Sequence, residues 1–284
     1  MFWKIRGERL DCSKKILMMG ILNITPDSFS DGGRFFDPSE ALRRAFDLAG
    51  QGADILDLGA ESTRPGADLI PASEEARRIL PVLEGILQKI RIPVSIDTTK
   101  PEIARLCLEK GAHIINDVSA LRDSGSEMAE LVRRYGAGLI LMHRRGRPWT
   151  MQSLAVYEDV VAEVCQELAQ SLEMALEAGL EPEQIVVDPG LGFAKTFEHN
   201  IEIMRRLETF QTLGRPVLLG PSRKSFIGKV TGREAAERDF GTAGVAAIAV
   251  MKGIRLLRVH EVSGARDAVA MAEAIRGEDY VRTL

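Results

Sequence analysis

The feature that most limits the fold of this chain is a unit that repeats along it: a short apolar run, a polar loop, a helical pattern and a glycine. The apolar runs occupy residues 16–24, 55–59, 93–97, 113–118, 138–143, 185–188, 216–220 and 256–259. They are nearly continuous instead of alternating in polarity, which is typical of strands covered on both faces. Such strands are parallel, and parallel strands need long crossover connections, usually helices.

The segments between the apolar runs fit such helices. The clearest helical pattern spans 157–178, where Val160, Val164, Leu168 and Leu172 are spaced four apart. A glycine, suited to the left-handed residue that ends a helix, precedes five of the runs, at Gly52, Gly111, Gly136, Gly179 and Gly253. Eight such units in 284 residues predict one closed (β/α)8 TIM barrel, a fold of roughly 250 residues, in preference to an open doubly wound sheet.

The domain organisation follows from the position of the first run. Residues 16–284 are predicted to form the barrel, with no linker or low-complexity tract inside it. Residues 1–15 precede it as an N-terminal extension, with a possible hairpin that turns near Gly7. We expect this extension to plug the N-terminal mouth of the barrel.

The composition indicates which kinds of partner and which cellular compartment to expect for this chain. Hydrophobic residues make up 45% and charged residues 27%, as in an ordinary globular protein, and the net charge of -4 argues against nucleic acid. No stretch approaches the roughly 20 apolar residues of a membrane span, and the N-terminus does not resemble a secretory signal. Cys12, Cys107 and Cys165 are too scattered for a disulfide framework or a zinc site. We therefore expect a cytoplasmic protein with no nucleic acid or membrane partner.

Polar residues lie at the C-terminal end of every predicted strand or directly after it. They are Asn23, Asp57, Asp97, Asn116, His143, Asp188, Ser222 with Lys224, and Arg258 with His260. In a parallel barrel, function belongs to the C-terminal ends of the strands and the loops that follow. Burying polar groups without partners costs free energy, so their recurrence at all eight ends predicts a functional site. A purely bracing role for single members, such as Asp57, remains open.

The first two strand-to-helix loops are long. They comprise residues 25–33 and 61–67, which we interpret as lids over the site, although turn-rich connectors would look similar. Oxygen atoms of Asn23 and Asp31 suit Mg²⁺. The Ser-Thr-Arg run at 62–64 suits an anionic group such as phosphate.

Two further groupings suggest what the site recognises. Asp97 and Asn116 should face each other across adjacent strands, and with Asp188 they could read the amidine-like edge of a flat heterocycle. A polar plug of the barrel would contain the same residues. Arg258 and His260 lie two apart, so their side chains should point the same way and form a cationic corner for an anion.

Other chemistries lack their motifs. The glycine-rich segments 188–196 and 220–225 do not have the spacing of a nucleotide-triphosphate loop. The four histidines show no spacing typical of a metal centre. No cysteine–histidine pair suggests a nucleophilic mechanism.

At these residues the chain resembles the dihydropteroate synthases of the pterin-binding barrel family. The motifs that carry the resemblance lie at 19–33, 59–66, 95–98, 115–118, 141–143, 188–193, 220–226 and 258–262. The departures are conservative: Ala60 where the family often has glycine, and Glu261 where it often has aspartate. Eight motifs in order, spanning nearly the whole chain, make the resemblance specific.

The resemblance implies a transferase of folate biosynthesis. Such an enzyme joins 6-hydroxymethyl-7,8-dihydropterin diphosphate to 4-aminobenzoate, giving 7,8-dihydropteroate and diphosphate. It also implies Mg²⁺ as cofactor, a homodimer, and a site at which sulfonamides compete with 4-aminobenzoate.

Site residues carry over position by position. The pterin-binding positions are Asp97, Asn116, Met142, Asp188, Phe193 and Lys224. The diphosphate-binding positions are Asn23, Thr63, Arg64, Arg258 and His260. The aminobenzoate-binding positions are Thr63, Pro65, Phe193, Ser222 and Lys224. The implied metal ligands are Asn23 and Asp31, and the implied catalytic residues are Asp97, Asp188, Lys224 and Asn23.

Two alternatives belong to the same barrel family. One is a methyltransferase that moves a methyl group from methyltetrahydrofolate to a corrinoid. The Thr-Pro-Asp-Ser-Phe-Ser-Asp loop at 25–31 and the Ser-Arg-Lys-Ser segment at 222–225 argue against it. The other is a non-catalytic pterin-binding paralogue, which is expected to lose Asn23, Asp97, Lys224 or Arg258. All four are present.

Overall fold

A computed structural model describes residues 1–24, 38–61 and 69–277 and confirms the barrel. Eight parallel strands lie side by side in the order β8-β7-β6-β5-β4-β3-β10-β9. They are β3 (Leu17–Asn23), β4 (Ile55–Gly59), β5 (Val94–Asp97), β6 (Ile114–Asp117), β7 (Gly138–Met142), β8 (Ile185–Asp188), β9 (Leu218–Leu219) and β10 (Leu256–Val259). The ring closes between β8 and β9 through one parallel bridge, Val187 to Val217, where the Val187 amide donates to the Pro216 carbonyl at 3.1 Å.

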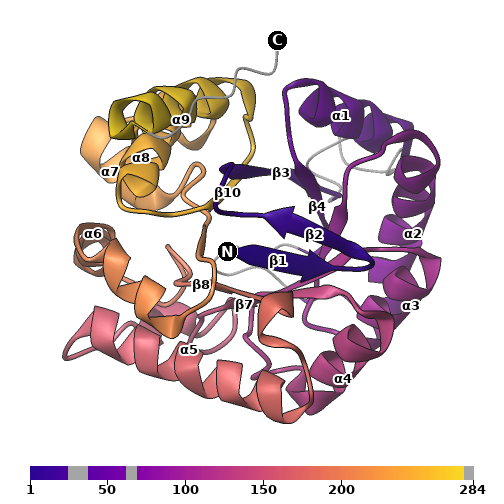
Figure 1. Ribbon diagram of the computed structural model, residues 1–284. Coiled ribbons are helices and arrows are strands. Elements are labelled where there is room, and N and C mark those ends of the chain that lie inside the picture. The colour runs from indigo at the N-terminus through magenta and orange to yellow at the C-terminus, as the bar shows by residue number, and fades with distance from the viewer. Residues whose placement is uncertain (25–37, 62–68, 278–284) are drawn as a thin grey trace.

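Helices surround the strands (Figure 1). They are α1 (Pro38–Gly50), α2 (Ala72–Lys89), α3 (Pro101–Lys110), α4 (Gly125–Tyr135), α5 (Val160–Glu177), α6 (Phe197–Arg205), α7 (Ser225–Thr231), α8 (Asp239–Met251) and α9 (Ser263–Arg276). Gly111 ends α3 in the left-handed conformation, with φ of 116°, as the sequence predicted. None of the helices in the described parts of the chain is long and apolar enough to cross a membrane.

The largest departures from the predicted boundaries concern one helix and one strand. The helix expected over 157–178 begins at Val160, because the Asp159 carboxylate caps it by accepting the amides of Val161 and Ala162. The strand expected over 216–220 is reduced to the two residues of β9. The physical reason is proline at both of its flanks, since neither Pro216 nor Pro221 has an amide to donate to a neighbouring strand.

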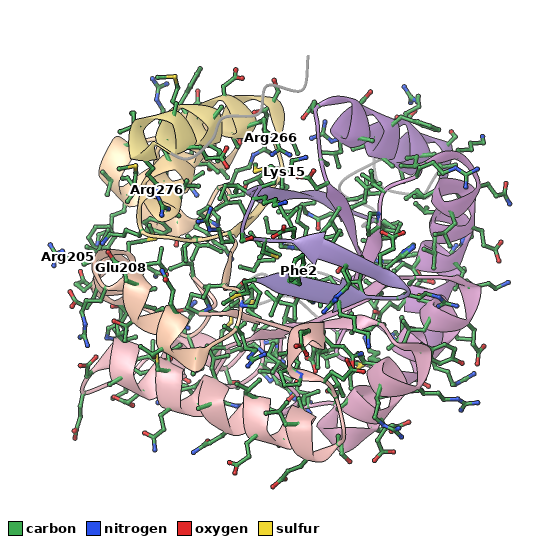
Figure 2. The ribbon with its side chains drawn as sticks, viewed as in Figure 1. Phe2, Lys15, Arg205, Glu208, Arg266 and Arg276 are labelled. Atoms are coloured by element: carbon green, nitrogen blue, oxygen red, sulfur yellow. The ribbon has the colours of Figure 1, made fainter. Side chains whose placement is uncertain are left out.

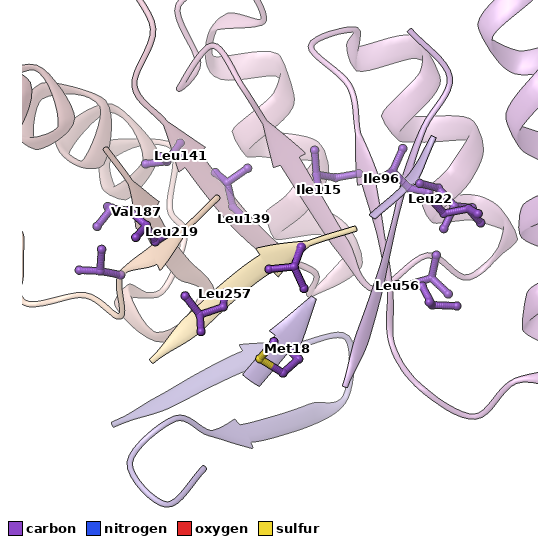
Figure 3. Close-up of a cluster of buried hydrophobic side chains, with 14 of the residues drawn as sticks. Met18, Leu22, Leu56, Ile96, Ile115, Leu139, Leu141, Val187, Leu219 and Leu257 are labelled. Carbon is purple, nitrogen blue, oxygen red and sulfur yellow. The ribbon is translucent and has the colours of Figure 1, made fainter. Parts of the chain in front are cut away.

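Side chains alternate along each strand between the barrel interior and the helices. The helix-facing set forms one large apolar core; Figure 3 shows part of it, including Met18, Leu56, Ile96, Ile115 and Leu257. The interior positions near the strand starts are also apolar, among them Ile55, Ile114, Val186 and Leu256. Two residues further along the same strands, the interior positions become polar: Asp57, Asn116, Asp188 and Arg258. The alternation therefore puts a dry core at one end of the barrel and a polar set at the other.

A hairpin seals the dry end. Strands β1 (Phe2–Ile5) and β2 (Glu8–Asp11) pair antiparallel around a turn at Gly7 and lie across the middle of the barrel in Figure 1. Trp3 and Ile5 are completely buried in the interior cluster, and the Trp3 indole N–H donates to the Gln184 carbonyl at 2.9 Å. The division of the chain into an extension at 1–15 and a barrel at 16–284 stays a prediction.

Polar contacts fasten the chain that follows the hairpin. The Asp54 carboxylate pairs with both Lys15 and Arg266, two side chains labelled near each other in Figure 2. Asp54 also accepts the Met18 amide at 2.8 Å. These contacts tie the first barrel strand to α9, at the end of the barrel away from the polar set.

The burial of Trp3 gives a stability prediction. Trp3→Ala should lower the free energy of unfolding by about 3–5 kcal/mol, because it leaves a cavity at the base of the barrel. Phe2→Ala is the matched control, since the neighbouring Phe2 ring is 46% exposed, and should change stability by less than about 0.5 kcal/mol. Urea unfolding of the three proteins measures both values, and a loss in Trp3→Ala as small as that expected for Phe2→Ala would show that the hairpin contributes little to the core.

Candidate active site

The candidate site lies where the interior strand positions turn polar. Parallel pairing puts Asp97 of β5 directly beside Asn116 of β6, as the sequence predicted, and Met142 of β7 beside Asp188 of β8. All four side chains are buried or nearly so. Four consecutive strands therefore present one amide, two carboxylates and a thioether to the same space.

The Arg258 guanidinium joins two carboxylates at this end of the barrel. Its Nε donates to Asp57 Oδ2 at 2.6 Å, and a terminal guanidinium nitrogen donates to Asp97 Oδ2 at 2.9 Å. Asp57 Oδ2 also accepts from Asn116 Nδ2 at 3.3 Å. Asp57 is wholly buried, so it braces both Arg258 and Asn116.

The carboxylates of Asp57 and Asp97 each bind the Arg258 guanidinium through one oxygen. The second oxygen of each makes no such contact. Asp57 Oδ1 and Asp97 Oδ1 are buried and find no hydrogen-bond partner among the described residues. Burial raises the pKa of Asp97 and the neighbouring Asp57 charge adds to this, while Arg258 opposes both. A buried carboxylate oxygen without a partner calls for a functional explanation, and a ligand N–H group would satisfy it.

Asp188 and Lys224 lie near each other on the β8–β9 side. Asp188 Oδ1 accepts the Gly190 amide at 2.7 Å, and burial raises the pKa of Asp188 to about 6. The Lys224 ammonium lies 4.1 Å from the centroid of the Phe193 ring, and burial lowers the pKa of Lys224 to about 8. A Cβ at Gly192 would lie 3.1 Å from Lys224 Cδ, so a glycine leaves room for this lysine. Phe193 and Lys224 therefore form one wall of the site, which presents both an aromatic ring and a positive charge.

The expected cationic corner needs a correction. His260 Nδ1 lies 2.9 Å from Ser222 Oγ, and its Nε2 lies 3.4 Å from Asn23 Nδ2. Burial, and then the nearby Arg258 charge, lowers the pKa of His260 to about 3. His260 is therefore neutral, and the positive charge at this corner belongs to Arg258.

Another strand-end residue does not face the site. His143 follows Met142, so the two-residue alternation turns it toward the helices, where it contacts Glu167 and Lys195. The alternation could have shown this from the sequence. Lys195 itself was missed, although it is buried, because its partner His143 is distant from it in the sequence.

A cavity of about 410 Å³ opens beside Asp97. Its wall includes Thr98, Lys100, Val118 and Arg144, which follow strands β5, β6 and β7. This volume is in the range of small-molecule sites. Of the polar strand-end residues described above, Asp97 lines this cavity and Asn116, Asp188 and Arg258 do not, so the cavity lies at the edge of the polar set.

Some expected ligands cannot be placed. Asp31, Thr63, Arg64 and Pro65 lie outside the described residues. Within residues 1–24, 38–61 and 69–277, no three His, Cys, Asp or Glu side chains gather as a metal centre would require. Of the two expected metal ligands, only Asn23 is placed, beside His260.

Comparison with known proteins gives this geometry a family context. Residues 19–260 match the family model described as pterin binding enzyme. The chain is 42% identical over 266 residues to a dihydropteroate synthase of Synechocystis, covering 93% of this chain and 92% of that one.

Two solved structures are similar as well. A dihydropteroate synthase of Thermus thermophilus in complex with 4-aminobenzoate has a TM-score of 0.87 and 44% identity, covering 97% of this chain and all of the other. A dihydropteroate synthase of Yersinia pestis with a sulfonamide drug complex has a TM-score of 0.91 and 35% identity, covering 98% and 100%.

The shared guanidinium predicts a pH-dependent stability effect. A raised pKa means that folded Asp97 holds its proton more tightly than unfolded Asp97, so its burial destabilises the fold increasingly above the ordinary pKa of 3.8. Arg258 limits this cost. Arg258→Met should therefore lower stability by about 3–5 kcal/mol at pH 8, and the loss should shrink as the pH falls toward 4.

Urea unfolding at pH 8, 7, 6 and 5 tests this. Lys4→Met is the matched control, because Lys4 pairs with Glu181 on the surface and should matter little at any of these pH values. A loss in Arg258→Met that stays constant with pH would mean that Arg258 contributes by packing and not by charge.

Proposed function

The chain belongs to the pterin-binding enzymes and, among them, to the dihydropteroate synthases, and from this premise we propose how its residues carry out the reaction. The reaction joins 6-hydroxymethyl-7,8-dihydropterin diphosphate to 4-aminobenzoate and releases diphosphate. The observation that carries the proposal is the buried polar set of Asp97, Asn116 and Asp188, in which an oxygen of Asp97 has no partner among the described residues. The relatives reported above are synthases, not corrinoid methyltransferases.

The pterin ring binds in the barrel against this set. Its amidine-like edge presents N–H donors and a ring acceptor, which match the Asp97 and Asp188 carboxylates and the Asn116 amide. Met142 and Phe193 supply apolar walls for the flat ring. Supporting this orientation, Arg258 donates to Asp97 at 2.9 Å and Asp57 accepts from Asn116 at 3.3 Å.

The chemical step breaks the bond between the pterin methylene carbon and the diphosphate oxygen. The electron pair leaves with diphosphate, and the positive charge left on the methylene spreads into the ring. The buried carboxylates of Asp97 and Asp188 stabilise that charge in surroundings of low dielectric constant. The nitrogen of 4-aminobenzoate then forms the new carbon–nitrogen bond and releases one proton. An aryl amine attacking a cation needs no strong general base.

The diphosphate binds at the corner of Arg258, His260 and Ser222. Arg258 supplies the charge, and the Ser222 hydroxyl supplies a hydrogen bond, while neutral His260 orients this hydroxyl from 2.9 Å away. By the family resemblance, Thr63 and Arg64 also contact the diphosphate. Because Asp97 and Arg258 are in direct contact, the side chains that bind the pterin ring and those that bind the diphosphate form one connected group.

Mg²⁺ fits the same corner. The Asn23 amide nitrogen faces His260, which leaves its oxygen, a ligand type that Mg²⁺ accepts, on the other side of the carboxamide. Asn23, with Asp31 by resemblance, would hold the ion together with phosphate oxygens, since Mg²⁺ often takes only one or two protein ligands. An ion held there would supply positive charge that offsets the charge of the leaving diphosphate.

The aminobenzoate pocket takes Phe193, Lys224 and Ser222 as its walls. Thr63 and Pro65 complete it by resemblance. Supporting this placement, Lys224 lies over the Phe193 ring, where an aromatic carboxylate would meet both a flat surface and a cation. Sulfonamides, the drug class named for the Yersinia structure, would compete for this pocket.

We also propose that the protein works in the cytoplasm. Its three cysteines are free thiols, and Cys12 and Cys107 are buried. Free thiols persist in a reducing compartment. Burial raises the pKa of Cys107 to about 12, which makes this thiol a poor nucleophile.

The reaction predicts a large effect of one carboxylate. Asp97→Asn should lower kcat/KM by roughly 100- to 1000-fold, because the amide keeps the shape but loses the charge that stabilises the cation. Steady-state assays with both substrates measure this. Asp54→Asn is the matched control, since Asp54 also pairs with an arginine but lies at the opposite end of the barrel, and it should keep wild-type turnover. Near wild-type turnover of Asp97→Asn would show that Asp97 only fills the barrel.

A homodimer is the second part of the proposal. Helices α8 and α9 pack together and leave large apolar side chains exposed: Phe240 at 94%, Ile248 at 52%, Met271 at 63% and Ile275 at 69%. Helix α8 is apolar on nearly every side, which is typical of a helix that is covered. We propose that a second copy of the chain covers this α8–α9 surface, which is self-complementary around a two-fold axis.

Light scattering should give twice the chain mass of 31.2 kDa. The double variant Phe240→Glu with Ile248→Glu should give the single-chain mass, because charge in the interface would be buried without a partner. Val156→Glu is the control, since Val156 is also apolar and 75% exposed but lies outside this surface. A double variant that still dimerises would move the interface elsewhere.

A further inference from the structure

Lys195 is a buried amine that the reaction described above does not use. It is 4% exposed and lies in the loop between β8 and α6. Its Nζ donates to the Phe193 carbonyl at 2.9 Å and lies 3.0 Å from His143 Nδ1. A lysine is almost never buried without a reason, so these two contacts need an explanation.

His143 is held from the outer layer of the fold. Its Nε2 lies 3.1 Å from Glu167 Oε2, on α5, and Glu167 Oε1 accepts from Arg145 Nε at 2.8 Å. A carboxylate only accepts hydrogen bonds, so Nε2 carries the proton and Nδ1 is an acceptor that faces Lys195. The His143 backbone amide also donates to the Asp188 carbonyl at 2.9 Å. Helix α5, strand β7 and the loop after β8 are thus joined through one imidazole ring.

The charges agree with this arrangement. Burial, and then the nearby Lys195 charge, lowers the pKa of His143 to about 3, so the ring is neutral. Burial lowers the pKa of Lys195 to about 7. Although burial opposes it, the hydrogen bonds from His143 and Arg145 lower the pKa of Glu167, which is therefore ionised.

The loop that Lys195 holds is under backbone constraint. Ala194, between Phe193 and Lys195, has φ of 49°, a left-handed conformation that residues with a Cβ rarely adopt. A Cβ at Gly190 would lie only 2.0 Å from the His143 carbonyl oxygen. The Gly192 amide donates to Asn200 Oδ1 at 2.7 Å. This close-packed turn directs the Phe193 ring to Lys224.

We propose that Lys195, oriented by His143 and Glu167, is a positioning residue that fixes Phe193 against Lys224 and so shapes the aromatic wall of the substrate site. The proposal rests on the proposed function, because it assigns that wall to the substrates. Lys195 acts through the Phe193 carbonyl and not on a reacting atom, since its amine is buried against protein groups. Glu167 and His143 keep the amine in place.

The test is a double-mutant cycle on the full enzyme. Lys195→Met keeps the length of the side chain and removes the amine; it should raise the KM for 4-aminobenzoate about tenfold and leave kcat within about threefold. Phe193→Ala should have a similar effect. The double variant should be no worse than Phe193→Ala alone, because the two residues act through one contact. Lys229→Met is the matched control, since Lys229 lies 4.3 Å from the Phe197 ring centroid but is 61% exposed, and it should behave as wild type.

Several outcomes would overturn the proposal. Additive losses in the double variant would mean that Lys195 acts apart from Phe193. A fall in kcat at unchanged KM would make it a participant in the chemistry. If Lys195→Met turns over with the KM of the wild type, the positioning role is refuted and the proposed function is not. If the wild-type protein itself shows no turnover, the proposed function is refuted.

A second variant guards against misfolding of Lys195→Met. Glu167→Gln changes a partly exposed side chain on α5, which also pairs with Arg122 and Arg145, and it weakens the hold on His143 without touching the loop. It should raise the same KM about threefold and leave the melting temperature close to that of the wild type. An unchanged KM in Glu167→Gln would contradict the role of the His143–Glu167 pair.

Discussion

The rest of this structure depends on the two-residue alternation of side chains in a closed parallel barrel. Because the interior is narrow, every second residue of each strand must either pack or pair there. The chain fills the lower interior with apolar residues and the Trp3 hairpin, and keeps the upper interior for charge. The apolar base of the barrel excludes water, so the carboxylates above it lie in surroundings of low dielectric constant. There an unpaired charge costs much free energy, and a hydrogen bond or ion pair is strengthened.

That cost explains the arrangement of charges at the upper end. Three buried carboxylates, of Asp57, Asp97 and Asp188, face one guanidinium and one partly shielded ammonium, those of Arg258 and Lys224. Protein partners satisfy only part of this set, since the second oxygens of Asp57 and Asp97 have none among the described residues. A flat molecule with several N–H donors would provide the hydrogen bonds that these oxygens lack, so its binding lowers the free energy of the set. Ligand binding should then stabilise the fold as well, because it supplies the missing partners.

The sequence predicts much of this, for reasons that lie in particular residues. Continuous apolar runs identify all eight strands because parallel strands are covered on both faces. Strand-end polarity identifies Asp97, Asn116, Asp188 and Arg258 because alternation puts them inside. The same rule, applied strictly, would have turned His143 outward. The charge state of His260 could not be predicted, because it depends on burial next to Arg258, and neither could Lys195, whose environment comes from α5 and β7, elements distant in the sequence.

The contrast between Lys195 and Lys224 shows how the fold gives one residue type two roles. Both lysines lie in loops after neighbouring strands, and burial lowers the pKa of each. Lys224 lies over the Phe193 ring, where a ligand can reach the wall that the two form, whereas Lys195 donates to the carbonyl behind the same residue. Phe193 therefore has Lys195 at its carbonyl and Lys224 at its ring, and in the proposed function the substrate contacts the ring. A loop with a left-handed Ala194 can serve as a binding wall only if something outside the site holds it, and here helix α5 does so through Glu167 and His143.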